Sequence, residues 1–289
     1  ADPKKMAHWM PVDLYSGGAE HTTMHLLYSR FWHKALFDIG LVADSEPYKA
    51  RVNHGLVLGP DGQKMSKSKG NVLDPDEVVL RLGADTVRMY LAFMGPYTGG
   101  ASYPWNPDGV VGLRRFIERV WRIGQLPAAS FQVSENAKLE STLHKTIKKV
   151  GEDIAVMKFN TAISSLMILL NEIEKTGSVG RVQWETYLKL LAPFAPHVAE
   201  ELWRELGNKK SVHLEEWPAY DTALLIDETV TIAVQVNGKT RGEAQVQSGA
   251  DKTAQEGAAR EAVAARLEGK KIVRTIVVPN RLVNFVVAD

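Results

Sequence analysis

The spacing of hydrophobic residues divides the chain into three regions with different expected secondary structure. Residues 8–100 alternate short apolar runs with amphipathic stretches, which is typical of an α/β fold. Residues 108–207 place apolar residues three and four positions apart, which predicts a helical bundle. From residue 228 onward, segments in which apolar residues alternate with polar ones lie on both sides of one Ala-rich stretch, which predicts a small α+β domain. The predicted domains are residues 1–107, 108–216 and 228–289, with residues 217–227 as a linker.

The first half of the α/β region predicts a strand followed by a long helix. The strand covers Val12–Tyr15 and ends at the Ser-Gly-Gly of residues 16–18. The helix runs from about Glu20 to Asp38, with apolar residues at helical spacing and Gly40 as its stop signal.

The second half of this region predicts a buried strand at residues 55–58 that enters a Gly-Pro-Asp-Gly turn. Asp74 is a good N-cap, and Pro75 suits the first helical position. A second helix is expected from Ala84 to Met94, with Gly83 as the break between the two.

In the helical region one apolar stripe runs from Leu143 to Ile173, and a further helix is expected around residues 187–191. Pro193 and Pro196 interrupt the pattern before residues 200–203. Three tryptophans within these apolar patterns are expected in the core: Trp121, Trp184 and Trp203.

The last region predicts two hairpins around a helix. Apolar residues alternate from Val230 to Val236, and Asn237-Gly238 is a strong hairpin turn. An Ala-rich helix is expected from about Thr253 to Leu267, and residues 272–287 suggest a closing hairpin.

Composition limits the kind of protein. The chain has 289 residues, a net charge of +1 and no cysteine, which excludes disulfides and thiolate metal sites. No stretch has the roughly 18 apolar residues of a membrane span, so we expect a cytoplasmic protein without a membrane partner. A nucleic-acid partner would have to meet local basic patches. Since the chain opens without an initiator Met and quickly reaches a catalytic-looking segment, we expect it to be the later part of something longer.

The densest chemical signal is the run Lys64–Asn71, which holds three lysines and two serines in its first six residues. A loop of this composition suits binding of phosphate oxygens, although a solvated basic loop is the simpler alternative. Its letters, KMSKS followed by KGN, resemble the signature loop of class I aminoacyl-tRNA synthetases. The resemblance implies that lysines there stabilise charge on the α-phosphate of ATP.

A second cluster follows the first strand. Gly17 and Gly18 would allow a ligand to approach the backbone closely, and Glu20 could accept hydrogen bonds from ribose hydroxyls. The alternative is that the glycines only shape a tight turn. His21 and His25 lie four residues apart, but the chain offers them no further metalloprotease signature, and we expect no bound structural metal.

These two clusters and several other segments together are similar to the leucyl-tRNA synthetase family of bacterial type. The matching segments are residues 9–15, 17–21, 25–31, 54–55, 64–71, 83–88, 196–197, 200–203, 236–239 and 241. The resemblance covers nearly the whole chain and corresponds to the C-terminal part of that enzyme. It implies the second half of a Rossmann-like catalytic domain, a helical tRNA-binding bundle and a C-terminal tRNA-binding domain.

The resemblance also implies roles for individual residues. Lys64 and Lys67 would serve the phosphates, and His25 would line the leucine pocket. The ATP and adenylate site would take the remaining matched residues: Gly17, Gly18, Glu20, His54, Met65, Ser66 and Ser68. The implied substrates are leucine, ATP with its Mg²⁺, and tRNA-Leu.

The chain also departs from the family's pattern. The His-x-Gly-His motif is absent, as is the editing domain inserted in the first nucleotide-binding half. The segment between Leu58 and Lys64 leaves no room for the extra domain that some bacterial members carry there. The chain is therefore expected to need an N-terminal catalytic half, in the same polypeptide or as a separate subunit, and to be inactive alone.

Basic residues outside the loop are candidates for phosphate contacts with tRNA, although a solvated helix surface is the simpler explanation for any one of them. The helical candidates are Arg115, Arg119, Arg122, Lys145, Lys148 and Lys149. The C-terminal candidates are Lys239, Arg241 and Arg274.

The sequence therefore predicts part of a leucine–tRNA ligase. Two alternatives stay open: a non-catalytic tRNA-binding module derived from this family, or a valyl- or isoleucyl-tRNA synthetase relative.

Overall fold

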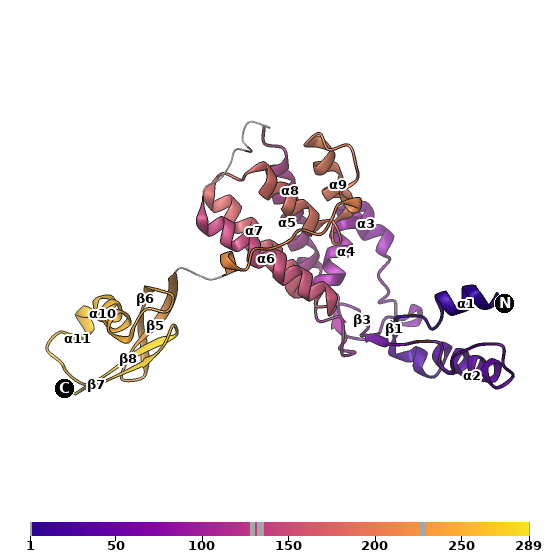
Figure 1. Ribbon diagram of the computed structural model, residues 1–289, viewed down its shortest axis with the longest axis horizontal. Coiled ribbons are helices and arrows are strands. Elements are labelled where there is room, and N and C mark those ends of the chain that lie inside the picture. Colours follow the sequence, from indigo (N-terminus) through magenta and orange to yellow (C-terminus); the bar gives the residue numbers. More distant parts are fainter. Residues whose placement is uncertain (1, 128–130, 132–135, 226–228, 289) are drawn as a thin grey trace. The chain divides into compact units, whose positions relative to one another are not determined.

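The computed structural model describes residues 2–127, 131, 136–225 and 229–288. The chain forms two compact units, Ala1–Tyr220 and Asp221–Asp289, and each is described by itself. Figure 1 shows the elements of both units.

The first unit begins with a helix and a pair of parallel strands. Helix α1 (Pro3–Trp9) is capped by Asp2, whose carboxylate accepts hydrogen bonds from the first-turn amides. Strand β1 (Tyr15–Gly18) pairs in parallel with β2 (Arg51–His54). A 3₁₀ turn, η1 (Ala19–Thr22), follows β1, and α2 (His25–Asp38) follows the turn.

Two expectations for this segment are wrong in their boundaries. Val12 forms only an isolated bridge with Tyr48, and the strand begins at Tyr15 and includes both glycines. The α-helix begins at His25 instead of Glu20. The reason is tertiary: pairing with β2 holds the two glycines extended, and the chain needs the η1 turn before it can enter the helix.

Two short strands and two helices follow α2 and β2 in the first unit. Strand β3 (Val57–Leu58) pairs in parallel with β4 (Tyr103–Pro104), so the strand expected at residues 55–58 is present but shorter. The loop after it contains the 3₁₀ turn η2 (Lys67–Lys69). Asp74 caps α3 (Pro75–Leu82) as expected, and Gly83, at φ +92°, separates it from α4 (Ala84–Phe93).

Five further helices form the bundle labelled in Figure 1. They are α5 (Pro107–Gly124), α6 (Ala137–Ala155), α7 (Phe159–Thr176), α8 (Arg181–Leu191) and α9 (Pro196–Glu205). Helix α4 packs against α5, α7 and α9 of this bundle. The stripe expected from Leu143 to Ile173 is interrupted between α6 and α7, where Met157 adopts φ +57°. Pro196 occupies the first turn of α9 as its sequence suggests.

One hydrophobic core joins α3 and α4 to the bundle. Trp184 and Trp203 lie in it, but Trp121 is 38% exposed, so its expected burial is wrong. The buried face of α5 contains Phe116, Ile117 and Val120. One helical residue turns about 100°, which places Trp121 beside that stripe.

A polar joint connects α4 with the start of α9. The Asp85 side chain, 6% exposed, accepts a hydrogen bond from the Val198 amide at 2.9 Å and lies 2.7 Å from His197 Nδ1. Arg88 donates to the same carboxylate at 2.8 Å. A carboxylate at a helix N-terminus satisfies amides that have no partner within the helix.

The second unit contains a four-stranded sheet and two short helices. Its strands are β5 (Thr229–Val236), β6 (Lys239–Gln247), β7 (Lys271–Val278) and β8 (Leu282–Ala288), in the order β6-β5-β8-β7. Strands β5 and β8 run parallel, and the other neighbours run antiparallel.

The turn and helix of this unit follow the sequence closely. Asn237 and Gly238 both adopt positive φ, as a tight hairpin turn requires. The expected helix over residues 253–267 is divided into α10 (Lys252–Ala262) and α11 (Ala264–Leu267), because Val263 leaves helical geometry and is buried. Core residues from the strands pack beneath these helices.

The residues expected to form a linker are shared between the units. Residues 217–220 belong to the first unit. The Trp217 side chain packs on Gly151, since a Cβ added to Gly151 would lie 3.2 Å from the indole nitrogen. Residues 221–225 belong to the second unit and include η5 (Ala223–Leu225), while residues 226–228 lie outside the described part.

Candidate active site

The glycine cluster lies at the end of the β1–β2 pair. Gly17 is in register with Asn53, and Gly18 with His54. Glu20 follows in η1, and its side chain folds back over the strand end. Its carboxylate lies where a side chain on Gly18 would be, since a Cβ added there would come within 2.3 Å of it. A Cβ on Gly17 would lie 3.0 Å from the Tyr15 ring, so the two glycines leave room for the Tyr15 and Glu20 side chains to lie against the strand.

His25 opens α2 and is oriented by an aromatic neighbour. Its Nδ1 lies 3.2 Å from the Tyr15 hydroxyl, and the two rings stack with centroids 5.6 Å apart. Tyr15 was not among the expected site residues. Tyr15 lies two positions before Gly17 on the same strand, so the two residues face the same side. A strand extended through the glycines would therefore have placed Tyr15 in the site.

A second tyrosine connects the β1–β2 end to the segment after α4. The Tyr97 hydroxyl lies 2.8 Å from Ser16 Oγ, and its ring lies 5.6 Å from that of His54. Both rings line a hollow of about 180 Å³ with Leu91 and Met94. Gly55 is required beside it, since a Cβ there would lie 1.5 Å from the Ala101 carbonyl oxygen. Sequence reasoning found His54 but missed Tyr97.

The lysine-rich loop leaves β3 as a small hairpin. The Gly59 amide donates to the Gln63 carbonyl at 2.8 Å, and Leu58 forms a bridge with Lys64. Met65 packs against the main core, whereas Lys64, Lys67 and Lys69 are exposed.

Hydroxyl and amide groups organise the tip of this loop. Ser66 Oγ and Ser68 Oγ are 2.7 Å apart, and the Ser66 amide donates to the Asn71 side chain at 2.9 Å. Gly70 ends the loop at φ +65°. Within the described residues no hydrogen bond or ion pair joins the loop to Glu20.

Arg119 and Lys149 are held by carboxylates through hydrogen bonds. Arg119 binds Glu174 through several hydrogen bonds and also donates to Asn171. The hydrogen bonds from Arg119 hold the pKa of Glu174 below its usual value. Lys149 lies 2.5 Å from the buried carboxylate of Asp153, which also accepts from Thr161.

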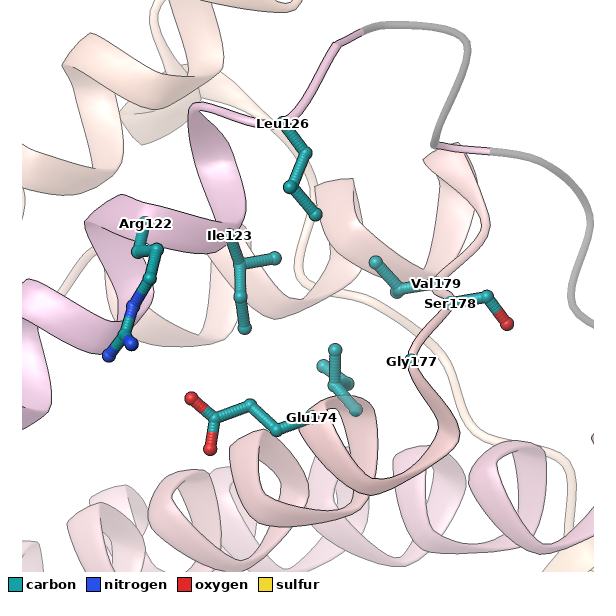
Figure 2. A pocket seen from close by; sticks show the side chains of 8 residues that line it. Arg122, Ile123, Leu126, Glu174, Gly177, Ser178 and Val179 are labelled. Atoms are coloured by element: carbon teal, nitrogen blue, oxygen red, sulfur yellow. The ribbon is translucent and has the colours of Figure 1, made fainter.

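The other helical cations differ in their surroundings. Arg115 is exposed and has no hydrogen bond or ion pair within the part of the chain that the structure describes. Figure 2 shows Arg122 on the same side as Glu174 of a hollow of about 490 Å³, which Ile123, Leu126 and Val179 line with apolar side chains. Lys148 lies 3.9 Å from Glu152 and over the Tyr220 ring, and Lys145 is half-buried.

The candidates of the second unit are exposed on two edge strands of the sheet. Lys239 and Arg241 belong to β6, and Arg274 belongs to β7, at the opposite edge. The fold therefore does not bring the two sets together.

Membrane spans and metal sites are both missing from the described residues. None of their helices is long and apolar enough to cross a membrane. No group of three or more His, Asp or Glu side chains among them is arranged to hold a metal ion.

Comparisons with known proteins identify the family. Residues 1–102 match the family of class I tRNA synthetases for isoleucine, leucine, methionine and valine, and residues 136–256 match the anticodon-binding domain of tRNA ligases. A leucine–tRNA ligase of Chlorobium phaeobacteroides is 49% identical over 99% of this chain, and one of Herpetosiphon aurantiacus is 50% identical over 96%. The chain belongs to the leucyl-tRNA synthetase family.

A solved structure of this family has the same fold. The Agrobacterium radiobacter K84 leucyl-tRNA synthetase agnB2, in a ternary complex with tRNA and LeuAMS, matches 96% of this chain with a TM-score of 0.70 and 33% identity. The chain spans 36% and 35% of the two curated relatives and 38% of that structure. It therefore combines class I catalytic and anticodon-binding sequence in a mixed helix-and-sheet fold, as the sequence predicted.

Proposed function

We propose that this chain is the part of a leucine–tRNA ligase that provides the cationic loop, one side of the nucleotide site and the tRNA-binding regions. The parent reaction joins leucine to ATP as leucyl-adenylate, releases pyrophosphate, and transfers the leucyl group to the terminal ribose of tRNA-Leu. The observation that carries this proposal is the KMSKS loop of residues 64–68, held on β3 with its lysine side chains in solvent.

The chemistry asked of this chain is positioning and charge stabilisation. Lys64 and Lys67 are free to approach phosphate oxygens from a loop whose base is fixed, and ATP would bring Mg²⁺ on its own phosphates. Gly17, Gly18 and Glu20 would form the adenylate side of the site, and the exposed Glu20 carboxylate, which lies against the backbone of Gly18, would accept hydrogen bonds from the ribose. His54, Met65, Ser66 and Ser68 complete the proposed nucleotide site.

Leucine recognition is proposed for His25. Its stacking on Tyr15 fixes the imidazole at the start of α2, beside the glycine-lined strand end. A ring held in place by a neighbour loses little freedom when a ligand binds, which favours tight selection of the side chain.

The partner most clearly required is the N-terminal catalytic half. Helix α2 exposes large apolar side chains, with Phe31 exposed to 74%, Tyr28 to 68% and Trp32 to 65%. Apolar surface of this kind marks a protein interface. In the complete synthetase the half with the His-x-Gly-His motif would cover this face and close the active site.

For tRNA, the proposed contacts on the bundle include Arg115 and Arg122, with Lys239, Arg241 and Arg274 in the second unit. Lys145 and Lys148 also remain candidates, although both already interact within the chain. Arg119 and Lys149 would have to exchange a carboxylate partner for phosphate, so we assign them weaker contributions. A cytoplasmic location follows from the proposed role in translation.

Leucine-dependent ATP–pyrophosphate exchange tests the proposal. The chain should be inactive alone and active after an N-terminal catalytic half is added, with leucine far more effective than valine or isoleucine. Binding of tRNA without exchange under any complementation would instead favour a tRNA-binding module.

Within the active enzyme, Lys67→Ala should lower adenylate formation by roughly 10²–10³-fold with little change in tRNA affinity, because the loop acts on phosphate. Lys69→Ala is the matched control, because it also removes one lysine charge, two residues further along the loop. The Lys69 ammonium lies 3.4 Å from the Gln63 side chain. Equal losses from both substitutions would show a general effect of positive charge.

A further inference from the structure

The cationic loop is closed by one side chain. Asn71 lies just beyond the loop, yet its amide contacts both the start and the middle of it. Its Oδ1 accepts from the Ser66 amide at 2.9 Å, and its Nδ2 donates to Asp61 Oδ2 at 3.1 Å and lies 3.4 Å from the Lys64 carbonyl. Residues 61, 64, 66 and 71 are thereby tied together.

The chemistry of the partners fixes the orientation of this amide. The Ser66 N–H can only donate, so it requires the carbonyl oxygen of Asn71, and a carboxylate can only accept, so it requires the NH₂ group. Hydrogen bonds from the Gln63 amide and from Asn71 hold the pKa of Asp61 below its usual value, and Asp61 is therefore charged at neutral pH. Each group of the connection is matched to its partner.

The backbone leaves space for this connection. A Cβ added at Gly59 would lie 2.6 Å from Asp61 Oδ1 and 3.1 Å from Asn71 Nδ2. Gly59 is therefore the residue that allows the two side chains to meet over the base of the hairpin.

The connection restrains the loop without neutralising it. Asp61 accepts its hydrogen bonds from the Gln63 amide N–H and from the neutral side chain of Asn71. Among the described residues no ion pair involves Lys64 or Lys67, so their charges stay available. A loop held in place by short-range hydrogen bonds presents its cations from fixed positions, which reduces the ordering required when a phosphate binds.

We propose that Asp61 and Asn71 are positioning residues: they form a latch that holds the backbone of Ser66 and Lys67 so that Lys64 and Lys67 meet the nucleotide from a defined place. The existence of the latch follows from these contacts alone. Its effect on the reaction rests on the proposed function.

The test exchanges the two chemical groups. Asn71→Asp keeps the acceptor for Ser66 but sets two carboxylates against each other. Asp61→Asn removes the charge but keeps an acceptor for Asn71 and for Gln63. In the double variant D61N/N71D the amide of position 61 donates to the carboxylate of position 71, so the link is restored in reverse.

The first measurement is tryptic cleavage after the loop lysines in this chain, which needs no nucleotide. N71D should speed cleavage about 10-fold, as expected when one or two hydrogen bonds to a charged group are lost. D61N/N71D should return the rate to within about 3-fold of the original chain. Because N71D and the double variant share the same residue 71, an altered preference of trypsin affects both equally.

The second measurement is leucine-dependent ATP–pyrophosphate exchange with the N-terminal half added. N71D should lower kcat about 10-fold or more, with recovery in D61N/N71D. Unchanged cleavage in N71D, or a double variant as impaired as N71D in either assay, overturns the latch. Faster cleavage with unchanged exchange overturns its positioning role. Absence of exchange in the unsubstituted protein would refute the proposed function, while the cleavage assay would still decide whether the latch exists.

Discussion

Two regions of the first unit differ in how far their hydrophobic side chains are buried. In the bundle, Leu166, Leu170 and Trp184 are completely buried. In the described residues 2–77, Leu26 is the only buried branched aliphatic side chain, and Phe31 and Trp32 on α2 remain largely exposed. Both regions have apolar helices, so composition is not the difference. The bundle finds its partners within this chain, whereas α2 presents a face that the proposed N-terminal half would cover.

The largest expected effect separates these two regions by stability. Leu170→Ala should cost about 2–5 kcal/mol in the free energy of unfolding, since the side chain is fully buried. Phe31→Ala should change it by less than about 1 kcal/mol in this chain, because the ring is 74% exposed. Urea unfolding followed by far-ultraviolet circular dichroism measures both.

The comparison fails if Phe31→Ala destabilises the isolated chain as much as Leu170→Ala does. It is sharpened if Phe31→Ala leaves the chain stable but weakens its association with the N-terminal half.

An intermediate effect is expected at the joint between α4 and α9. Asp85→Ala removes a buried carboxylate and leaves the Val198 amide without its acceptor, which should cost about 1–3 kcal/mol. Asp85→Asn should cost less because one oxygen remains. Urea unfolding measures the loss, and faster hydrogen exchange at the Val198 amide locates it.

Arg88→Ala is the matched control for this joint. Its side chain is 46% exposed, so loss of its ion pair with Asp85 should cost under about 1 kcal/mol. An equal loss from Arg88→Ala and Asp85→Ala would contradict the assignment of the cost to the helix cap.

The smallest effect concerns an exposed ion pair beside α2. Hydrogen bonds from Arg30 and Lys34 lower the pKa of Glu46 to about 2, from an ordinary value of 4.5. Since the folded-state value is the lower one, the stabilisation is complete above about pH 4.5 and is lost as the pH falls toward 2. Salt should weaken it because the groups are exposed.

Arg30→Met should move the pKa of Glu46 upward toward 4.5, as measured from the carboxyl carbon shift in an NMR titration. Asp13, which pairs with Lys49 at 2.7 Å, serves as an internal reference and should keep its lowered pKa. An unchanged Glu46 titration would show that Arg30 is not the main cause.

Local features of the fold were within reach of the sequence. Asp74 and Pro75 begin α3 and Asn237-Gly238 turns the β5–β6 hairpin, since caps and tight turns depend on residues within four positions. The Lys149–Asp153 pair was accessible by the same reasoning, because its members lie one helical turn apart. The lysine loop by itself indicated a class I aminoacyl-tRNA synthetase, because its signature is a run of consecutive residues.

The tertiary structure decided what depends on distant partners. Pairing with β2 moved the first strand onto Gly17 and Gly18, and Glu174, fifty-five positions away, engaged Arg119. Residue types and their spacing determined the family, the three kinds of region and the candidate phosphate-binding loop, because these are properties of neighbouring residues. Which cations are free, which tyrosines orient the site and which side chain closes the loop depend on contacts that form only when separate segments pack together.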